Sequence, residues 1–376
     1  MDIQKITVLF LIAFSFGKAY SQTSNDVLNL LIASKTITQQ QADSIRAEAA
    51  IKQQTADVNK KSFFVNAAKQ IQLSGYTQVR YQNLDEIGKI DGFDVRRARL
   101  GAKGNISPVW NYVIQFELAG TTKLLDAYAE AKIAEYFNIT IGQSKIPLSL
   151  ENITATNKLE SIDFSQVVEA LAARGKDVIG NHNGLDLGVQ VGGSLLKIKE
   201  LPLLDYKIGI FNGAGINVAD NNESKDFGGR LVLHPIKGMD LGGTYYNGWA
   251  NYGTPKATNK ARNRIGFELS YEYKNASFKS EYIKGKDDKI NREGYYAQLG
   301  YFIIPQKLQI ITKYDYYDQN TSISEDIATN YILLLNYNFT PLARIQAGYY
   351  FRDKTQKGPQ INNGYNMGVI QFQIGF

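Results

Sequence analysis

The feature that most constrains this chain is an alternation of apolar and polar residues that begins near Ile71 and continues to the last residue, Phe376. The final stretch VIQFQIGF puts aliphatic and aromatic residues on one parity and glutamines on the other. A period of two residues is that of a β-strand with one apolar face. A strand that runs to the end of a chain needs a partner strand to hold it in place, because chain ends otherwise fray.

About sixteen such segments of roughly 9 to 14 residues follow one another, separated by clusters of Gly, Asn, Asp or Pro. A soluble β-sandwich would turn the apolar parity toward a core, whereas a membrane barrel turns it toward lipid. The segment lengths and the Tyr and Phe residues at segment ends favour the barrel. We therefore predict an all-β fold: a transmembrane antiparallel β-barrel of about 16 strands over residues 68–376, whose last strand pairs with the first near Ile71.

The connections between segments also have a pattern, because short turns such as NISP, IPQK and TPLA alternate with longer loops. The longer loops are expected near residues 146–182, 212–224, 250–260, 285–292 and 353–363. The longest, 146–182, contains the helix-like stretch DFSQVVEALAARGKD. Since long loops in compact barrels are usually functional, we expect this one to narrow the lumen, with Glu160, Asp163 and Glu169 meeting arginines of the wall. A loop that caps the outside or packs on a neighbouring subunit is the alternative.

The N-terminal part has a different composition. Residues 1–21 resemble an export signal, with Lys5 ahead of an apolar run and a small-residue cleavage pattern at the end. Residues 22–67 are expected to form a periplasmic segment of two short helices, the second opening at Thr38 with Gln41 at capping-box spacing. This segment could pair with those of neighbouring subunits as a coiled coil or act as a spacer. Export and the absence of Cys fit a bacterial envelope compartment.

Strand parity assigns the arginines of the barrel to its two faces. One arginine, Arg96, breaks the parity rule, and because it lies near a strand end it could snorkel to the membrane interface. A charge facing lipid at mid-depth would cost about 2 to 4 kcal/mol. The arginines on the polar parity, which should therefore line the lumen, are Arg80, Arg97, Arg99, Arg230, Arg262, Arg264, Arg344 and Arg352.

A cluster of basic residues stands out in the stretch DVRRARLGAKG, where Arg96, Arg97, Arg99 and Lys103 share one strand and Arg80 lies on its neighbour. Their mutual repulsion calls for an anion or a carboxylate from an inward loop. Guanidinium groups bind phosphate in bidentate fashion, and a ring of basic side chains selects anions. Alternatively, the lumen arginines balance lumen carboxylates of the same parity, which are Glu117, Asp126, Glu130, Glu268, Glu272, Glu281 and Asp315.

Motifs of catalysis and cofactor binding are not found. The two histidines, His182 and His234, are not part of a zinc-protease motif. No nucleophile elbow or phosphate-binding Gly-Lys-Ser/Thr motif occurs in the sequence. The absence of Cys excludes thiolate metal sites and Cys nucleophiles. We predict no enzymatic activity, no cofactor, no metal site and no nucleic-acid partner.

Several of these stretches resemble the phosphate-selective porin O and P family, namely GYTQVRYQ, GFDVRRARLGAKGNISPVWNYVIQFELAG, LLDAYAEAKI, IGQSKIPLSLENITATNKLESIDFSQVVEAL and the C-terminal QFQIGF. The resemblance implies a sixteen-stranded, usually trimeric, anion-conducting porin of the bacterial outer membrane whose lumen arginines bind phosphate. It gives a phosphate-contacting role to Arg96, Arg97 and Arg99. It also implies that Phe372 and Phe376 belong to a signal read by the barrel-assembly machinery.

The predicted function is therefore passive diffusion of small solutes, with a preference for small anions such as phosphate or polyphosphate. The predicted partners are these anions, outer-membrane lipid, the barrel-assembly machinery and further copies of the chain in a homotrimer. One alternative is a structural or interaction barrel plugged by its long loop, with the N-terminal arm contacting periplasmic partners. A secreted sandwich or adhesin is another.

Overall fold

The computed structural model describes residues 28–29, 31–52, 71–85, 90–198, 201–253, 258–353 and 365–376. It divides the chain into two units, Met1–Lys69 and Gln70–Phe376, and the predicted export signal lies outside the described residues. In the first unit, residues 39–52 form a helix. The predicted capping box is confirmed, because the Thr38 amide donates to Gln41 Oε1 at 2.9 Å and the Gln41 amide donates to Thr38 Oγ1 at 3.2 Å. None of the described helices is long and apolar enough to cross a membrane.

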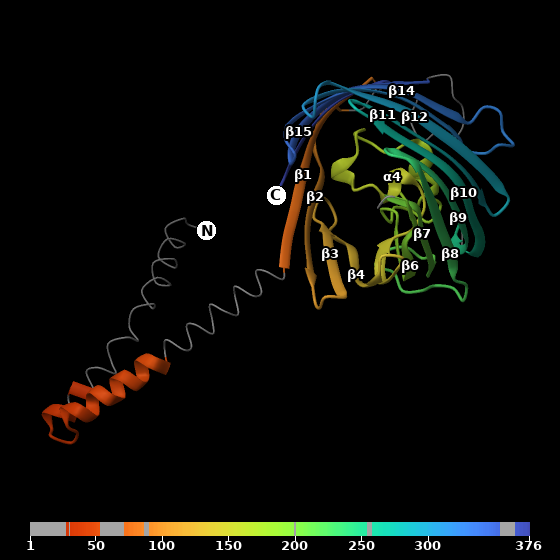
Figure 1. The fold of residues 1–376 in the computed structure, drawn as a ribbon. Helices are drawn as coiled ribbons and strands as arrows, with labels where there is room; N and C mark the ends of the chain where they lie inside the picture. Colours follow the sequence, from red (N-terminus) through yellow and green to blue (C-terminus); the bar gives the residue numbers. More distant parts are fainter. Residues whose placement is uncertain are drawn as a thin grey trace. The chain divides into compact units, whose positions relative to one another are not determined.

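The second unit is a closed antiparallel barrel, in which each strand pairs with its neighbours in the chain and β16 returns to β1 (Figure 1). The prediction of sixteen strands is confirmed. The strands are β1 (Ile71–Leu84), β2 (Gly92–Asn105), β3 (Trp110–Glu117), β4 (Lys123–Ala134), β5 (Phe137–Lys145), β6 (Leu185–Ile198), β7 (Leu201–Phe211), β8 (Asp226–Ile236), β9 (Met239–Tyr252), β10 (Thr258–Tyr273), β11 (Ala276–Asp287), β12 (Ile290–Ile304), β13 (Leu308–Asp318), β14 (Ile327–Thr340), β15 (Ala343–Arg352) and β16 (Met367–Gly375).

The last strand closes the barrel, and this explains the alternation at the chain end. The register of β16 against β1 runs from Gly375 opposite Tyr76 to Met367 opposite Leu84. Phe376 extends the pairing by one residue, because its amide and carbonyl both bond to Gly75, at 3.0 and 3.2 Å. The seam thus closes the barrel along β1 from Gly75 to Leu84.

The two faces of the barrel wall have opposite chemistry. On β16, the side chains of Ile370, Phe372 and Ile374 are 49%, 41% and 53% exposed, whereas Gln371 and Gln373 are 1% and 4% exposed. The outward face is thus an apolar surface suited to lipid, and the inward face is polar. This is the reverse of a soluble sheet protein, whose apolar parity would be the buried one.

Short turns at one end of the barrel alternate with longer connections at the other, with one exception. The predicted long loop at 285–292 is wrong, because β11 and β12 extend into it and leave a two-residue turn at 288–289. Asp288 has a positive φ of 56° there, which two-residue hairpin turns require. The longest connection, residues 146–184, joins β5 to β6 and is called the inner loop below.

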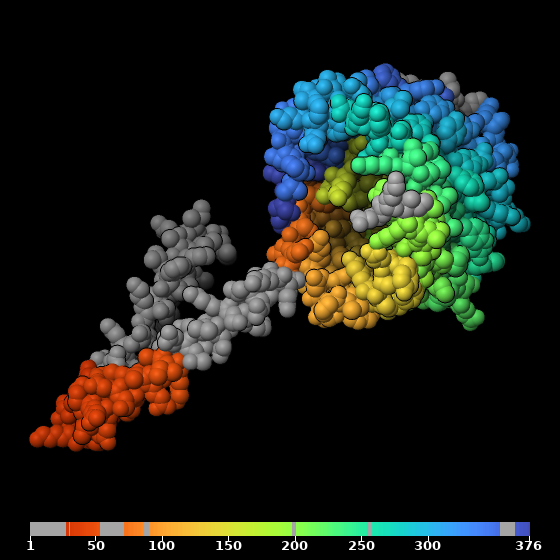
Figure 2. All heavy atoms as spheres, viewed as in Figure 1, coloured from red at the N-terminus to blue at the C-terminus, as the bar shows by residue number. Residues whose placement is uncertain are grey.

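The inner loop lies inside the barrel, where Figure 2 shows it within the opening of the wall. It contains α4 (Leu150–Ile153), the 3-10 helix η1 (Thr156–Lys158) and α5 (Gln166–Leu171). The helix expected over DFSQVVEALAARGKD is therefore only six residues long. The rest of that stretch turns back on itself, as shown by the Lys176 amide donating to the Glu169 carbonyl at 3.0 Å.

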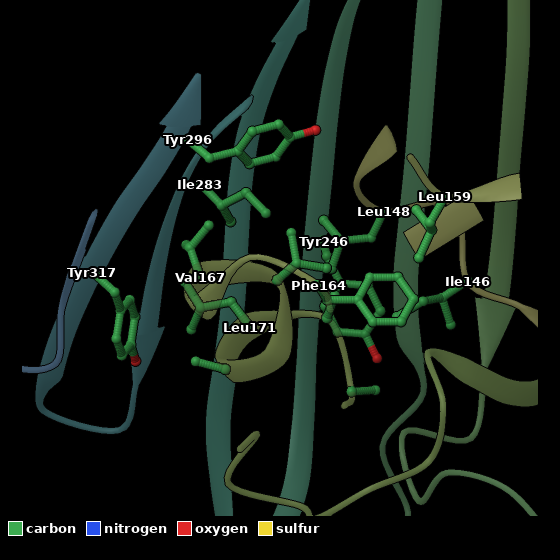
Figure 3. Close-up of a cluster of buried hydrophobic side chains, with 14 of the residues drawn as sticks. Ile146, Leu148, Leu159, Phe164, Val167, Leu171, Tyr246, Ile283, Tyr296 and Tyr317 are labelled. Atoms are coloured by element: carbon green, nitrogen blue, oxygen red, sulfur yellow. The ribbon is translucent and has the colours of Figure 1, made fainter. Parts of the chain in front are cut away.

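A hydrophobic cluster fastens the inner loop to one side of the wall (Figure 3). Phe164, Val167 and Leu171 pack against side chains that point inward from β9, β11, β12 and β13, among them Tyr246 and Tyr317. A second cluster joins Ile162 to the wall of β13–β16. The two clusters therefore attach the loop to strands of the β7–β16 part of the wall.

Candidate functional site

Two cavities lie beside the inner loop. The first, of about 520 Å³, is bounded by β2, β3, the inner loop and the ends of β13–β15. The second, of about 380 Å³, is bounded by β1–β5, β7, β8 and the inner loop. Arg99 lines both cavities, so they are neighbours along the lumen.

Both cavities carry more basic than acidic side chains. The first is lined by seven Arg and Lys residues and four carboxylates, and the second by four basic residues and two carboxylates. The basic residues come from the wall and from the inner loop alike, since Arg174 and Lys176 of the loop line the first cavity. An excess of fixed positive charge in a narrow, partly desolvated channel attracts anions.

Arg96 owes its position to a β-bulge. The register of β1 against β2 shifts there, so that Val95 and Arg97 pair with consecutive residues of β1 and Arg96 is the extra residue. The bulge turns Arg96 inward, where its Nη2 donates to Asp163 Oδ1 of the inner loop at 3.1 Å. The expectation that Arg96 breaks the parity rule and snorkels is therefore wrong, because simple alternation does not continue through a bulge.

The first group of lumen cations is paired with carboxylates. Arg80 donates twice to Asp94, at 2.9 and 2.8 Å, and Arg99 donates to Glu117 at 2.9 Å. In these pairs the positive charge is balanced locally, as the charge-balance interpretation expects. The other members are Arg96 with Asp163, Arg230 with Glu268, Arg262 with Asp177, Arg264 with Asp287 and Lys313 with Glu151.

The second group of cations is held by neutral oxygens. Arg97 donates to Gln78 Oε1 at 2.7 Å, and Arg344 donates to Gln373 Oε1 at 3.1 Å. No ion pair within 4.0 Å is formed by these two arginines, nor by Arg174 or Lys145, within the described part of the chain. Arg97, Arg174 and Arg344 are called uncompensated below, because no carboxylate lies within 4.0 Å of them in the described ranges. Arg344 Nε has no hydrogen-bond partner there either.

Arg174 of the inner loop and Lys145, the last residue of β5, are also held by neutral oxygens. Arg174 donates to Asn152 Oδ1 at 2.9 Å and to the Asn183 carbonyl at 3.1 Å. Lys145 at the end of β5 donates to the loop carbonyls of Asn152 and Thr154 at 2.6 and 2.8 Å. Burial lowers the pKa of Arg174 to about 10, so the group is still protonated at neutral pH.

Arg97 and Arg174 share an aromatic neighbour, Phe164. The guanidinium of Arg174 lies 3.6 Å from the centre of the Phe164 ring, and that of Arg97 lies 5.9 Å from it. Both cations line the first cavity together with this ring. The ring partly desolvates the two guanidinium groups without neutralising them, which strengthens their attraction for an anion.

The three predicted loop carboxylates differ in what they meet. Asp163 contacts wall arginines, Arg96 at 3.1 Å and Arg80 at 3.6 Å. Burial would raise the pKa of Asp163, but the charges of Arg96, Arg80 and Arg97 outweigh burial and lower it. Glu169 instead accepts the amide of Gly175 at 2.9 Å within the loop. The contacts expected between wall arginines and Glu160 and Glu169 are absent among the described residues.

Glu160 is instead the docking point of the loop on a belt of wall amides. Its carboxylate accepts hydrogen bonds from Ser277, Gln298 and Gln309, at 3.1, 2.6 and 3.0 Å, and lies 3.4 Å from Lys279. The Glu160 carbonyl accepts two further amide bonds, which come from Asn336 and Gln346 at 2.9 and 3.0 Å. One residue of the loop is thereby joined to β11–β15.

Arg262 and Arg264 do not reach the two cavities. They are 1% and 2% exposed and lie beneath the end of α5, where Arg264 donates to the Leu171 carbonyl at 3.0 Å. Their partner Asp177 was not singled out from the sequence. A signal for such a pair existed, because two arginines on one strand face a loop that contains carboxylates. Glu151, which pairs with Lys313, was missed in the same way.

The remaining predicted residues do not line the first cavity. Lys103 is exposed on β2 near the turn at 106–109, outside both cavities. Arg230 lines the second cavity but is paired with Glu268. Phe372 and Phe376 are 41% and 68% exposed on the outer surface.

Comparisons with known proteins agree with this architecture. Residues 66–248 match the family model described as Phosphate-selective porin O and P. Similar solved structures include OmpT of Vibrio cholerae in a trimer form (12% identity, TM-score 0.60) and an anion-selective porin from Comamonas acidovorans (14% identity, TM-score 0.60), each alignment covering 81% of this chain and 99% of the other. OprB of Pseudomonas putida aligns at 10% identity with a TM-score of 0.62, over 82% of this chain and 95% of the other. The comparison with curated proteins gave no match.

Proposed function

Since residues 66–248 match the phosphate-selective porin O and P family and the chain has the fold of bacterial outer-membrane porins, we propose that its lumen passes small anions in preference to cations. The observation that carries this proposal is the group of arginines held by neutral oxygens, Arg97, Arg174 and Arg344. A cation paired with a carboxylate contributes little net field, whereas an uncompensated one lowers the energy of a passing anion.

The first cavity is the candidate anion-binding position. Arg97 and Arg174 line it together with the ring of Phe164, whose centre lies 5.9 and 3.6 Å from their guanidinium groups, and neither arginine forms an ion pair among the described residues. Guanidinium groups offer several fixed donors and suit the oxygens of phosphate. Arg96 and Arg99 line the same cavity, but each already serves a carboxylate. We therefore assign the main anion contact to Arg97 and Arg174.

The inner loop is proposed to form the constriction. It occupies the lumen beside both cavities and supplies Arg174, while Asp163 draws it toward the basic wall of β1 and β2. An anion passing between the cavities would meet Arg99, which lines both. The charge of Arg99 is balanced by Glu117, so it would guide an anion past without retaining it tightly.

The proposal extends to assembly. We infer a homotrimer in outer-membrane lipid, and a C-terminal signal for the barrel-assembly machinery that includes Phe372 and Phe376. The outward apolar surface of β16 and a similar structure described as a trimer support this. The export signal at 1–21 and the periplasmic segment at 22–67 remain part of the proposal.

The test is a planar-bilayer recording of the refolded protein with phosphate added in steps. We expect open channels whose current is blocked by phosphate. The variants Arg97→Ala and Arg174→Ala should each weaken the block, while Lys103→Ala, which removes an exposed cation outside the cavities, should leave it unchanged. Channels without block would contradict a phosphate site, and a folded protein without any current would favour the alternative of a barrel plugged by its loop.

A further inference from the structure

A line of hydrogen bonds joins two uncompensated arginines across four neighbouring strands, β2, β1, β16 and β15. Arg97 Nη1 donates to Gln78 Oε1 at 2.7 Å. Gln78 Nε2 donates to Gln373 Oε1, also at 2.7 Å, and Arg344 Nη2 donates to the same oxygen at 3.1 Å. Two glutamines therefore stand between two guanidinium groups.

The arginines fix the direction of both amides. A guanidinium group has only donors, so Arg97 requires the oxygen of Gln78 and turns its Nε2 toward Gln373. The Nε2 of Gln373 donates to the Asn157 carbonyl of the inner loop at 3.2 Å. Gln78 and Gln373 are 1% and 4% exposed, so these bonds are made inside the wall with little help from water.

On β1 and β2, other arginines are held by carboxylates and not by amides. Arg80 of β1 is held by Asp94, and Arg99 of β2 is held by Glu117, a carboxylate in each case. Gln has nearly the shape of Glu and presents the same kind of oxygen, but it carries no charge. The residue type at position 78 therefore decides whether the positive charge of Arg97 acts on ions in the lumen or is neutralised by its partner.

We propose that Gln78 and Gln373 are specificity-determining residues of the pore: they orient Arg97 and Arg344 without neutralising them. This inference rests on the proposed anion preference and names the residues that preserve it. Ion preference and the strength of anion binding then depend on different properties of the Arg97 side chain. The charge of Arg97 sets ion preference, whereas its orientation by the amide sets how tightly an anion is held.

The test compares reversal potentials of the full-length protein in a KCl gradient. In Gln78→Glu the new carboxylate should pair with Arg97 and lower the chloride-to-potassium permeability ratio by at least about fourfold. This factor assumes that the one added negative charge acts through water from about 10 Å, so that it disfavours chloride and favours potassium. Gln72→Glu is the matched control, because it adds the same charge on the same face of β1 at an exposed position. The control should change the ratio less.

A second variant separates charge from orientation. Gln78→Met keeps the length of the side chain but offers no amide oxygen, so the reversal potential should remain that of the wild type while block by inorganic phosphate weakens. If Gln78→Glu does not fold, which the gel mobility of unheated samples reports, Gln373→Glu tests the same idea at Arg344.

The inference is overturned if folded Gln78→Glu channels, and Gln373→Glu channels, keep the wild-type permeability ratio. The proposed function fails separately, if the wild type itself shows no preference for chloride. Even in that case the difference between Gln78→Glu and the wild type still measures whether Gln78 preserves the charge of Arg97.

Discussion

Arg262 and Asp177 form a bidentate ion pair in which both side chains are shielded from solvent: Nε to Oδ1 is 3.0 Å and Nη2 to Oδ2 is 2.9 Å. The pair joins β10 to the inner loop just beyond α5. Burial would raise the pKa of Asp177, but Arg262 and Arg264 outweigh burial and lower it. The carboxylate therefore stays ionised and the loop end stays fastened to the wall.

The variant Asp177→Asn should destabilise the protein, because it leaves Arg262 buried with only Asp226, 4.0 Å away, as a carboxylate neighbour. Removing one partner of a buried pair typically costs about 3 to 5 kcal/mol. We expect a lower midpoint of thermal unfolding in detergent and unsteady single-channel currents. Asp220→Asn is the control, since Asp220 pairs with Lys225 at the surface and its loss should change the midpoint little. Equal effects of the two variants would contradict the role of the buried pair.

Docking of the inner loop should depend on pH through Asp163. Its pKa is lower in the docked loop than the ordinary value of 3.8, so the contact with Arg96 and Arg80 stabilises docking above that ordinary value. The stabilisation is lost as the pH falls through the lowered pKa. Titration of Asp163 should therefore leave the conductance constant from neutral pH down to about pH 4. Below that pH the conductance should change.

The variant Asp163→Asn checks this assignment at neutral pH. It should give the altered conductance without any acidification, because it removes the same charge. A wild-type conductance from Asp163→Asn at neutral pH would show that the contact with Arg96 and Arg80 does not hold the loop.

Glu160 should hold the tip of the loop against the amide belt of β11–β15. In Glu160→Gln a donor replaces one carboxylate oxygen and faces the donors of Gln298 and Gln309. The chain has no native Cys, so Lys158→Cys, at an exposed loop position, can carry a nitroxide label. We expect a more mobile label and a larger conductance in Glu160→Gln.

The control for Glu160→Gln is Glu272→Gln, which removes the other carboxylate near Lys279, at 3.5 Å, without touching the belt. Label mobility in this control should equal that of the labelled parent. If Glu160→Gln leaves both mobility and conductance unchanged, the hydrophobic clusters alone hold the loop.

The barrel was predictable because alternation is a local property that each strand carries by itself. The outward Ile370, Phe372 and Ile374 and the closing strand follow from it directly. The position of Arg96 did not, since a bulge depends on how two strands pair and leaves little trace in the alternation of one. The turn at 288–289 was missed because polar residues of the strand ends resemble those of a loop.

The site was predictable only in part, because parity gives the face of a side chain but not its partner. Arg97 and Arg262 look alike in the sequence, yet Arg97 meets an amide and Arg262 meets a carboxylate from a loop 85 positions away. Arg174 and Phe164 belong to the loop, to which no parity applies. Three-dimensional contacts were needed to separate balanced cations from uncompensated ones.

The most direct test of the account is the reversal potential of the wild-type protein in a planar bilayer under a KCl gradient. Because Arg97, Arg174 and Arg344 keep uncompensated charges, the account predicts a potential displaced toward the chloride equilibrium value. Replacing Arg97 and Arg174 together by Ala should move it toward zero. A wild-type potential at zero, or displaced toward potassium, would contradict the account.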